Sequence, residues 1–246
     1  MKWGKRLLLV LAVTVLLFIG AAVLLVTLVD PNDYKQLIVK EVHKATGREL
    51  TIGGDIELSF FPWLGLRLGA TELSNAPGFG ETPFARLQEA QVRVALLPLL
   101  KGEVRADTLK LNGLKVNLSK NQQGVANWDD LVAKGEPQPE PQEPPSPEEG
   151  KPALALALGG INIQQAALHW QDAQSGTDIE ISPFNLHTGA LAIGEPFDFK
   201  LNLKTINKTP QVTATINLQG QITLNPEQQR YQIKDLKLNL EALGDT

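Results

Sequence analysis

The feature that most constrains this fold is an alternation of apolar and polar residues, repeated in segment after segment of the chain. Leu66 and Leu68, for example, are separated by Arg67 and followed by Gly69. Successive side chains of a β-strand point to opposite faces, so the pattern predicts strands that each have one apolar face. The segments that follow it are 64–70, 90–96, 109–112, 114–118, 154–158, 161–163, 179–181, 201–203, 212–218 and 236–240. We therefore predict a mainly β protein.

Glycines interrupt this pattern at two places. Leu109 and Leu111 are odd-numbered, whereas the apolar residues directly after Gly113 are even-numbered, which predicts a β-bulge at this glycine. These residues are Leu114, Val116 and Leu118. Gly53 and Gly54 separate two short apolar stretches, which predicts a hairpin whose turn needs glycine at positive φ.

Residues 7 to 29 form a run of 23 residues without a charge. As a helix with a rise of about 1.5 Å per residue this run reaches about 34 Å, enough to cross a hydrocarbon core of about 30 Å. Lys2, Lys5 and Arg6 precede it, so the positive-inside rule makes residues 1–29 a cytoplasmic tip and transmembrane anchor, with the rest of the chain across the membrane. A cleaved signal peptide is the alternative, because small residues occur at 20–22. The apolar run continues too far beyond them for an ordinary signal sequence, which favours the anchor.

A helix is predicted directly after the apolar run. Asp30 is a suitable N-cap, Pro31 occupies the first helical position, and Gly47 suits the position after the last turn. Such a helix either closes the end of a sheet or lies on a membrane surface, and we expect the first. Its predicted apolar face consists of residues at helical spacing, Tyr34, Leu37, Ile38, Val42 and Ala45.

Proline and glutamate dominate the segment from residue 134 to residue 152, which contains seven of the chain's 16 prolines. Proline removes backbone donors and the segment has few apolar residues, so we predict a disordered linker or long loop. It separates two strand-rich stretches, 30–133 and 153–246, and the second is expected to continue the sheet of the first.

Composition and motifs argue against several function classes. The chain has no cysteine, and 23 Lys and Arg against 27 Asp and Glu give a net charge of −4, which provides no basic surface for nucleic acid. The three histidines have no partner at metal-ligand spacing and no nucleophile or phosphate-binding motif occurs, so we expect no metal and no cofactor. We also expect no enzymatic activity, because a paired-carboxylate hydrolase needs two acids that converge in a cleft and nothing in the sequence singles out such a pair. The acids that could be considered are Glu57, Asp107, Asp129, Asp130 and Asp172. Trp128 and Trp170 are predicted to pack within the protein rather than stack on a ligand.

Several motifs together closely resemble the amino-terminal region of the AsmA family. They are ATGRELTIGGDI (45–56), SFFPWLGL (59–66), LSNAPGF (73–79), LLPLL (96–100), NW (127–128) and LHWQD (168–172). The resemblance extends from the apolar run to about Gly176, and the remainder matches only in the style of its strands. Known members are longer, so we expect this chain to be an amino-terminal portion.

The resemblance implies a fold and a cellular setting. Such proteins are anchored in the inner membrane, project into the periplasm, and are implicated in outer-membrane assembly and in phospholipid passage between the membranes. They are related to bridge-like lipid transfer proteins, whose groove begins with a chorein-like helix and sheet. The resemblance therefore implies that residues 34–47 cap a groove and that the later strands form an elongated, curled, antiparallel-type sheet. It implies no catalytic residues.

The alternation alone leaves two interpretations open, a closed core or an open groove that holds acyl chains. With the resemblance, we predict an inner-membrane anchored periplasmic protein of outer-membrane biogenesis that binds or conducts phospholipid along an aliphatic groove. The competing hypothesis is a non-conducting scaffold or regulator of outer-membrane protein assembly with an envelope protein as its partner. The residues expected to face acyl chains are Leu66, Leu68, Val92, Val94, Leu109, Leu111, Val116 and Leu118.

Overall fold

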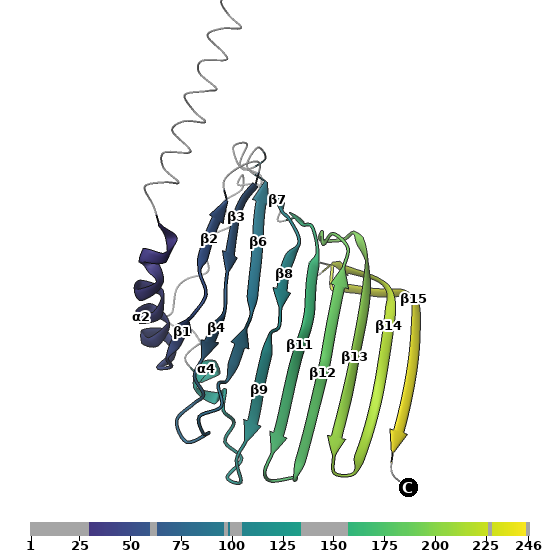
Figure 1. The fold of residues 1–246 in the computed structure, drawn as a ribbon. Coiled ribbons are helices and arrows are strands. Elements are labelled where there is room, and N and C mark those ends of the chain that lie inside the picture. The colour runs from purple at the N-terminus through teal and green to yellow at the C-terminus, as the bar shows by residue number, and fades with distance from the viewer. Residues whose placement is uncertain are drawn as a thin grey trace, which may run out of the picture.

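The structure is a computed structural model that describes residues 30–59, 63–95, 98, 105–133, 157–225 and 228–244. These residues form one 15-stranded sheet with few helices, so the prediction of a mainly β protein is confirmed (Figure 1). The helices are η1 (Pro31–Tyr34), α2 (Lys35–Thr46) and α4 (Asp129–Ala133). The strands are β1 (Leu50–Ile52), β2 (Ile56–Ser59), β3 (Trp63–Leu68), β4 (Thr71–Leu73), β5 (Ala85–Leu87), β6 (Glu89–Ala95), β7 (Arg105–Ala106), β8 (Leu109–Asn112), β9 (Lys115–Lys120), β10 (Ala157–Leu158), β11 (Ile161–Asp172), β12 (Thr177–Thr188), β13 (Pro196–Lys208), β14 (Gln211–Asn225) and β15 (Arg230–Gly244).

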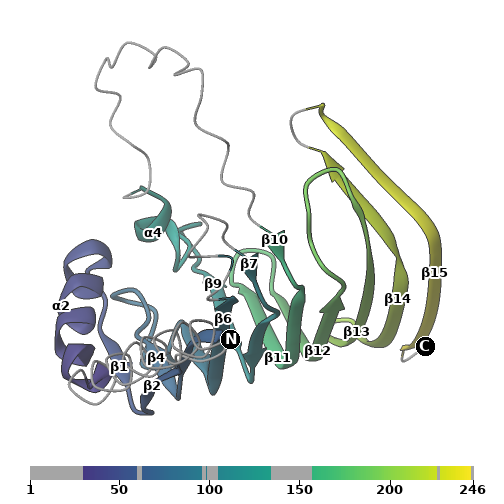
Figure 2. The ribbon, with the colours of Figure 1, turned by 90° about the horizontal axis from the view of Figure 1, so that it is seen from above.

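The sheet is open. Its strand order is β1-β4-β5-β9-β11-β12-β13-β14-β15, and a second path β2-β3-β6-β8 joins it at β11. The first strand of this order, β1, does not pair with the last, β15, so the sheet is not a closed barrel. Figure 2 shows that the sheet curls into a trough, with α2 near one edge and β15 at the other.

Few large side chains of the described residues are buried. A closed sandwich or barrel would bury rows of Leu, Ile and Val between its faces. Here four of the seven buried apolar residues are alanines, so no second layer covers the sheet in the described part of the chain. The seven are Ile56, Ala76, Ala126, Ala166, Phe197, Phe199 and Ala214.

The expectation of an antiparallel sheet is wrong where the second half of the chain meets the first. β11 runs parallel to β8 and β9, and β10 runs parallel to β7, whereas the other pairs are antiparallel. Parallel neighbours need a long connection, and residues 121–160 separate the end of β9 from the start of β11. The two strand-rich stretches therefore lie side by side in one sheet.

β8 and β9 form one line that breaks at Gly113, as the change of parity predicts. Gly113 has φ of +63°, and Gln165 in the neighbouring β11 has φ of +52°. Each paired residue of β8 and β9 lies opposite the residue of β11 that is 52 positions later in the chain, both before and after Gly113. β11 and the line of β8 and β9 therefore bulge together, and their apolar side chains stay on one face of the sheet.

The hairpin predicted around Gly53 and Gly54 is wrong. β1 pairs with β4 and β2 pairs with β3, so the two strands that flank the glycines are not partners. Neither glycine has a positive φ. A Cβ atom on Gly54 would lie 2.3 Å from the backbone nitrogen of Ala70, so glycine is required here by the close approach of two backbone segments.

The helix predicted from Asp30 to Gly47 is divided into η1 and α2. Asp30 is the N-cap of η1, where its carboxylate accepts a hydrogen bond from the backbone N–H of Asn32, and α2 begins at Lys35 without a side-chain cap. Gly47 ends α2 with φ of +77°, as the sequence predicts.

The contact face of α2 differs from the predicted one. Val39 and Val42 are half-buried, whereas Leu37 and Ile38 are 54% and 38% exposed. Lys35, whose Nζ lies 3.3 Å from Asp55 Oδ1, is on the side of α2 that meets the sheet, and much of the predicted apolar face is turned outward. An apolar stripe on a helix does not specify which neighbour covers it.

Two predicted segments lie outside the described residues. These are the anchor at residues 1–29 and the linker at residues 134–152. None of the helices within the described ranges has the length and apolar character needed to cross a membrane.

Candidate functional site: the apolar face of the sheet

Apolar side chains form a continuous row across the half of the sheet that is uppermost in Figure 1. Each member is the direct cross-strand partner of the next, and directly opposed side chains lie on the same face. The row crosses nine strands, so its eight spacings of about 4.8 Å extend over about 38 Å. Its members are Ile56, Leu68, Ala90, Leu111, Ile163, Leu186, Leu201, Leu218 and Leu238.

A second row crosses the lower half of the sheet, through β1, β4, β5 and β9 and then β11 to β15. Thr205 is its single polar member. This row consists of Leu50, Leu73, Ala85, Val116, Leu168, Ile181, Thr205, Ala214 and Ala242. We call the face that carries both rows the apolar face.

The apolar face is the inner face of the trough. Leu168 belongs to the lower row, and Trp170, two residues further along β11, lies on the same face. The rings of Trp170 and Trp128 are 5.5 Å apart and tilted by 42°. Trp128 directly precedes α4, which lies inside the curl of the sheet (Figure 2). The two tryptophans pack on each other, as predicted.

All eight residues predicted to face acyl chains lie on the apolar face. Leu66 pairs with Val92, Leu68 and Leu111 are members of the upper row, and Leu109 pairs with Ile161. The remaining three are Val94, opposite Leu64 and Ala106, Val116, a member of the lower row, and Leu118, opposite Trp170. Their contact with lipid stays a prediction.

The apolar face is most accessible toward β15. Leu238 is 60% exposed and Leu240 is 56% exposed, and at the other end of the sheet Leu66 is 42% exposed. Each buried methylene group contributes about 0.8 kcal/mol when it leaves water, so a row of exposed aliphatic side chains favours an apolar ligand. For such side chains the free energy of burial grows with the apolar area removed from water.

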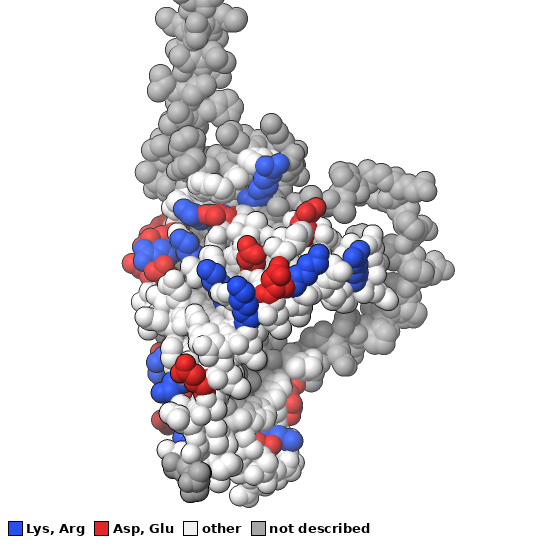
Figure 3. Space-filling model, turned by 90° about the vertical axis from the view of Figure 1, so that its right-hand side faces the viewer, with Lys and Arg blue, Asp and Glu red and all other residues white. Residues whose placement is uncertain are grey.

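The opposite, outer face is polar. Arg67 forms ion pairs with Glu57 and Glu89, with N–O distances of 3.1 and 2.7 Å, and Arg93 pairs with Asp107. Figure 3 views the β15 edge and shows charges of both signs gathered in clusters with uncharged surface between them. These exposed pairs contribute little to stability individually, and they keep this face in water.

Two adjoining hollows of about 460 and 290 Å³ lie on this polar side of the sheet. They share Lys200 and Asn202, and Asn202 donates a hydrogen bond to Asn217 across the strands. Amide and lysine side chains dominate both linings, so these hollows do not suit an acyl chain.

Asp178 is the most strongly perturbed acid of the outer face. Its carboxylate accepts hydrogen bonds from Lys208 Nζ at 2.8 Å and from His169 and Gln171 at 2.9 and 3.2 Å. The lysine contributes most, and together the three donors lower the pKa of Asp178 to about 2.

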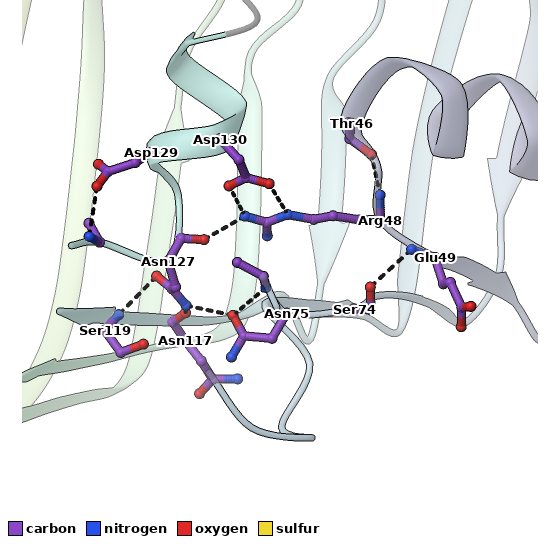
Figure 4. A network of polar contacts seen from close by, with 12 residues as sticks. Thr46, Arg48, Glu49, Ser74, Asn75, Asn117, Ser119, Asn127, Asp129 and Asp130 are labelled. Atoms are coloured by element: carbon purple, nitrogen blue, oxygen red, sulfur yellow. Dashed lines mark hydrogen bonds and ion pairs between the residues drawn. The ribbon is translucent and has the colours of Figure 1, made fainter. Parts of the chain in front are cut away.

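A buried polar network closes one end of the apolar face (Figure 4). The side chain of Arg48 is 1% exposed, and its Nε and Nη2 donate to the two carboxylate oxygens of Asp130 at 3.0 and 2.6 Å. Nη2 also donates to the backbone carbonyl of Asn127, and the guanidinium carbon lies 4.5 Å from the centre of the Phe84 ring. The hydrogen bonds from Arg48 hold the pKa of Asp130 below its usual value.

Asn127 connects this network to a further motif. Asn127 is fully buried, and its side-chain amide nitrogen donates to Asn75 Oδ1 at 2.8 Å and to the backbone carbonyl of Asn117 at 2.9 Å. Arg48, Asn75 and Asn127 belong to three of the motifs that the sequence displays far apart. The sequence contains no sign that these motifs are in contact, because hydrogen bonds between residues more than fifty positions apart produce no repeating pattern in the sequence.

The isolated acids are all engaged in structural contacts. Asp129 accepts from the backbone N–H of Ala126 at 2.8 Å, and Asp172 accepts from the backbone N–H of Gln174, which lowers the pKa of Asp172. Glu57, Asp107 and Asp130 form the ion pairs described above. Within the described ranges, no three His, Cys, Asp or Glu side chains gather as the ligands of a metal ion do.

These arrangements, an open curled sheet with one apolar face and a polar network that unites the motifs, agree with a comparison against protein families. The AsmA family matches residues 1–246. The chain belongs to the AsmA family. It is also 30% identical to Protein AsmA of Escherichia coli (strain K12) over 129 residues, which are 52% of this chain and 21% of that relative. This AsmA-family chain thus corresponds to a small part of the length of the relative it matches.

Proposed function

We propose that this chain is part of an inner-membrane anchored protein of outer-membrane biogenesis, which binds or conducts phospholipid along its apolar face. Its amino terminus lies in the cytoplasm and the sheet in the periplasm. Membership of the AsmA family supports a role in the cell envelope. The protein acts without a cofactor and without catalysis.

The observation that carries this proposal is the upper apolar row, uninterrupted over nine strands. Half of a hydrocarbon core of about 30 Å is the length of one acyl chain, about 15 Å. The row is about 38 Å long, more than twice the length of one acyl chain. An acyl chain can therefore move from strand to strand and stay in contact with aliphatic side chains. The polar outer face supplies the solubility that such a structure needs.

Photo-crosslinking tests this proposal. The full chain is expressed in membranes with a photoreactive phospholipid and then purified, and the fraction of crosslinked protein is measured. Leu111→Glu places a charge in the upper row, and we expect it to abolish crosslinking because a charge excludes acyl chains. Lys110→Glu is the matched control, since Lys110 is the next residue on β8 and lies on the outer face.

A second variant separates lipid contact from folding. Leu66 is 42% exposed, so Leu66→Glu is tolerated by the fold, and circular dichroism checks that the sheet persists. Loss of crosslinking in both folded variants supports the proposal. Equal crosslinking of Leu111→Glu, Leu66→Glu and Lys110→Glu refutes it.

The second candidate is a non-conducting scaffold or regulator of outer-membrane protein assembly with an envelope protein as its partner. Membership of the AsmA family supports it as well, since both candidates act in the cell envelope. A stable protein complex recovered on pull-down, without bound lipid, would support the scaffold over the conduit.

A further inference from the structure

The amino-terminal half of α2 carries an exposed apolar stripe. Tyr34, Leu37 and Ile38 are 52%, 54% and 38% exposed, and they lie three and four residues apart, on one side of the helix. The helix meets the sheet with a different side. Lys35 is ion-paired to Asp55, and Val39 is half-buried. The stripe therefore takes no part in holding α2 to the sheet.

We propose that this stripe docks on the surface of the phospholipid bilayer, with Tyr34, Leu37 and Ile38 at the boundary between headgroups and acyl chains. The uncharged run of residues 7–29 ends one residue before Asp30. Tyr34 is the fifth residue after Val29, and a chain extends by at most about 3.6 Å per residue, so Tyr34 lies within about 18 Å of the end of that run. A membrane anchor thus fixes the stripe beside the lipid.

Residue chemistry agrees with this occupant. Tyrosine is enriched at membrane interfaces, where its ring is apolar and its hydroxyl stays in water. Lys40 and Lys44 are exposed on the same helix, and lysines next to an apolar stripe attract anionic headgroups. Glu41, the one acid of α2, lies on the side of the stripe, three and four residues after Ile38 and Leu37, and the three lysines of the helix outnumber it.

Docking would press the α2 edge of the trough against the bilayer. α2 lies beside the first strands of the sheet in both ribbon views, and Asn32 at its start exchanges hydrogen bonds with the backbone of Ile56, the first member of the upper row (Figures 1 and 2). The start of the apolar row would then be held close to the lipids. This inference rests on the membrane anchoring in the proposed function and does not require lipid conduction.

The absence of cysteine permits a direct test with single labels. The full chain is reconstituted into vesicles of phosphatidylethanolamine and phosphatidylglycerol, with an environment-sensitive fluorophore on one introduced cysteine. The variants are Leu37→Cys, on the stripe, Gln36→Cys, a matched control at an exposed position on the other side of the same helix, and Leu17→Cys, within the uncharged run. Quenching by phospholipids with a spin label near the headgroup is measured at each position.

We expect a blue-shifted, strongly quenched emission at position 37 and an aqueous, weakly quenched emission at position 36. Equal emission and quenching at the two positions overturns the docking. A blue shift at position 37 without lipid quenching, dependent on protein concentration, overturns it in favour of a second copy of the chain. Position 17 separates the two ideas, because loss of quenching there contradicts the anchor itself, whereas quenching at 17 but not at 37 contradicts docking alone.

Discussion

Replacement of Arg48 by methionine should destabilise the protein through the network at the end of the apolar face. Methionine retains the aliphatic part of the side chain and removes two hydrogen bonds to Asp130 and one to the Asn127 carbonyl. Breaking a buried ion pair by removal of one partner costs about 3–5 kcal/mol. The Asp130 side chain is 31% exposed and regains some hydration, so we expect the lower end, about 3 kcal/mol.

Urea unfolding of the full chain, followed by tryptophan fluorescence, measures this loss. Arg67→Met is the matched control, because Arg67 also forms two ion pairs but its side chain is 46% exposed. Exposed pairs are worth little, so the control should unfold close to the original chain. Equal destabilisation by Arg48→Met and Arg67→Met would refute the reasoning that burial of the guanidinium makes this network strong.

The same variant has a pH signature. Arg48 lowers the pKa of Asp130 in the folded state, so this carboxylate stabilises the fold above its ordinary pKa, and that contribution disappears as pH falls through the lowered value. In Arg48→Met the pKa of Asp130 returns toward its ordinary value. The variant should therefore lose less stability than the original chain when the pH falls below about 4.

Three more substitutions test other features. Gly220→Ala should lower the free energy of unfolding, measured in urea, by about 1–2 kcal/mol, because its Cβ would lie 3.0 Å from the Lys234 carbonyl oxygen and 3.3 Å from a second backbone atom of β15. Gly189→Ala is the control and should be neutral in the same measurement, since its Cβ would meet nothing closer than 3.6 Å. Asp178→Asn should reduce the loss of stability between pH 4 and pH 2 by the share of this one carboxylate. The lowered pKa of Asp178 makes its contribution present above its ordinary pKa and lost as pH falls through about 2, and thermal unfolding over that range checks this. Trp128→Ala should cost about 2–3 kcal/mol in urea, because it removes the ring that packs on Trp170.

Strands and their faces were predictable from the sequence because the period of two is a local signal. Leu66 and Leu68 identify an apolar face without knowledge of any partner, and the parity change at Gly113 locates a bulge. The partners themselves were not predictable. Gly53 and Gly54 suggested a hairpin, but β1 and β2 pair with other strands, and the parallel contact of β11 with β8 and β9 depends on a connection with no periodic pattern.

The candidate site divides in the same way. The eight residues predicted to face lipid share one face, since that followed from alternation within each strand. The Arg48 network was missed, because its partners come from separate motifs and polar contacts carry no periodicity. The outward direction of Leu37 and Ile38 was also missed, because the helix pattern identifies an apolar side but not the neighbour that covers it.

The coordinated bulge at Gly113 and Gln165 has a consequence for sequence change in this family. β8 and β9 pair with β11 at the same distance of 52 residues along the chain, so deletion of Gly113 alone would shift β9 by one residue against β11. Lys115 and Asn117 would then turn toward the inside of the trough, and Val116 would turn toward water. A family member that gains or loses a residue between β8 and β9 should therefore gain or lose one at the facing bulge of β11 as well.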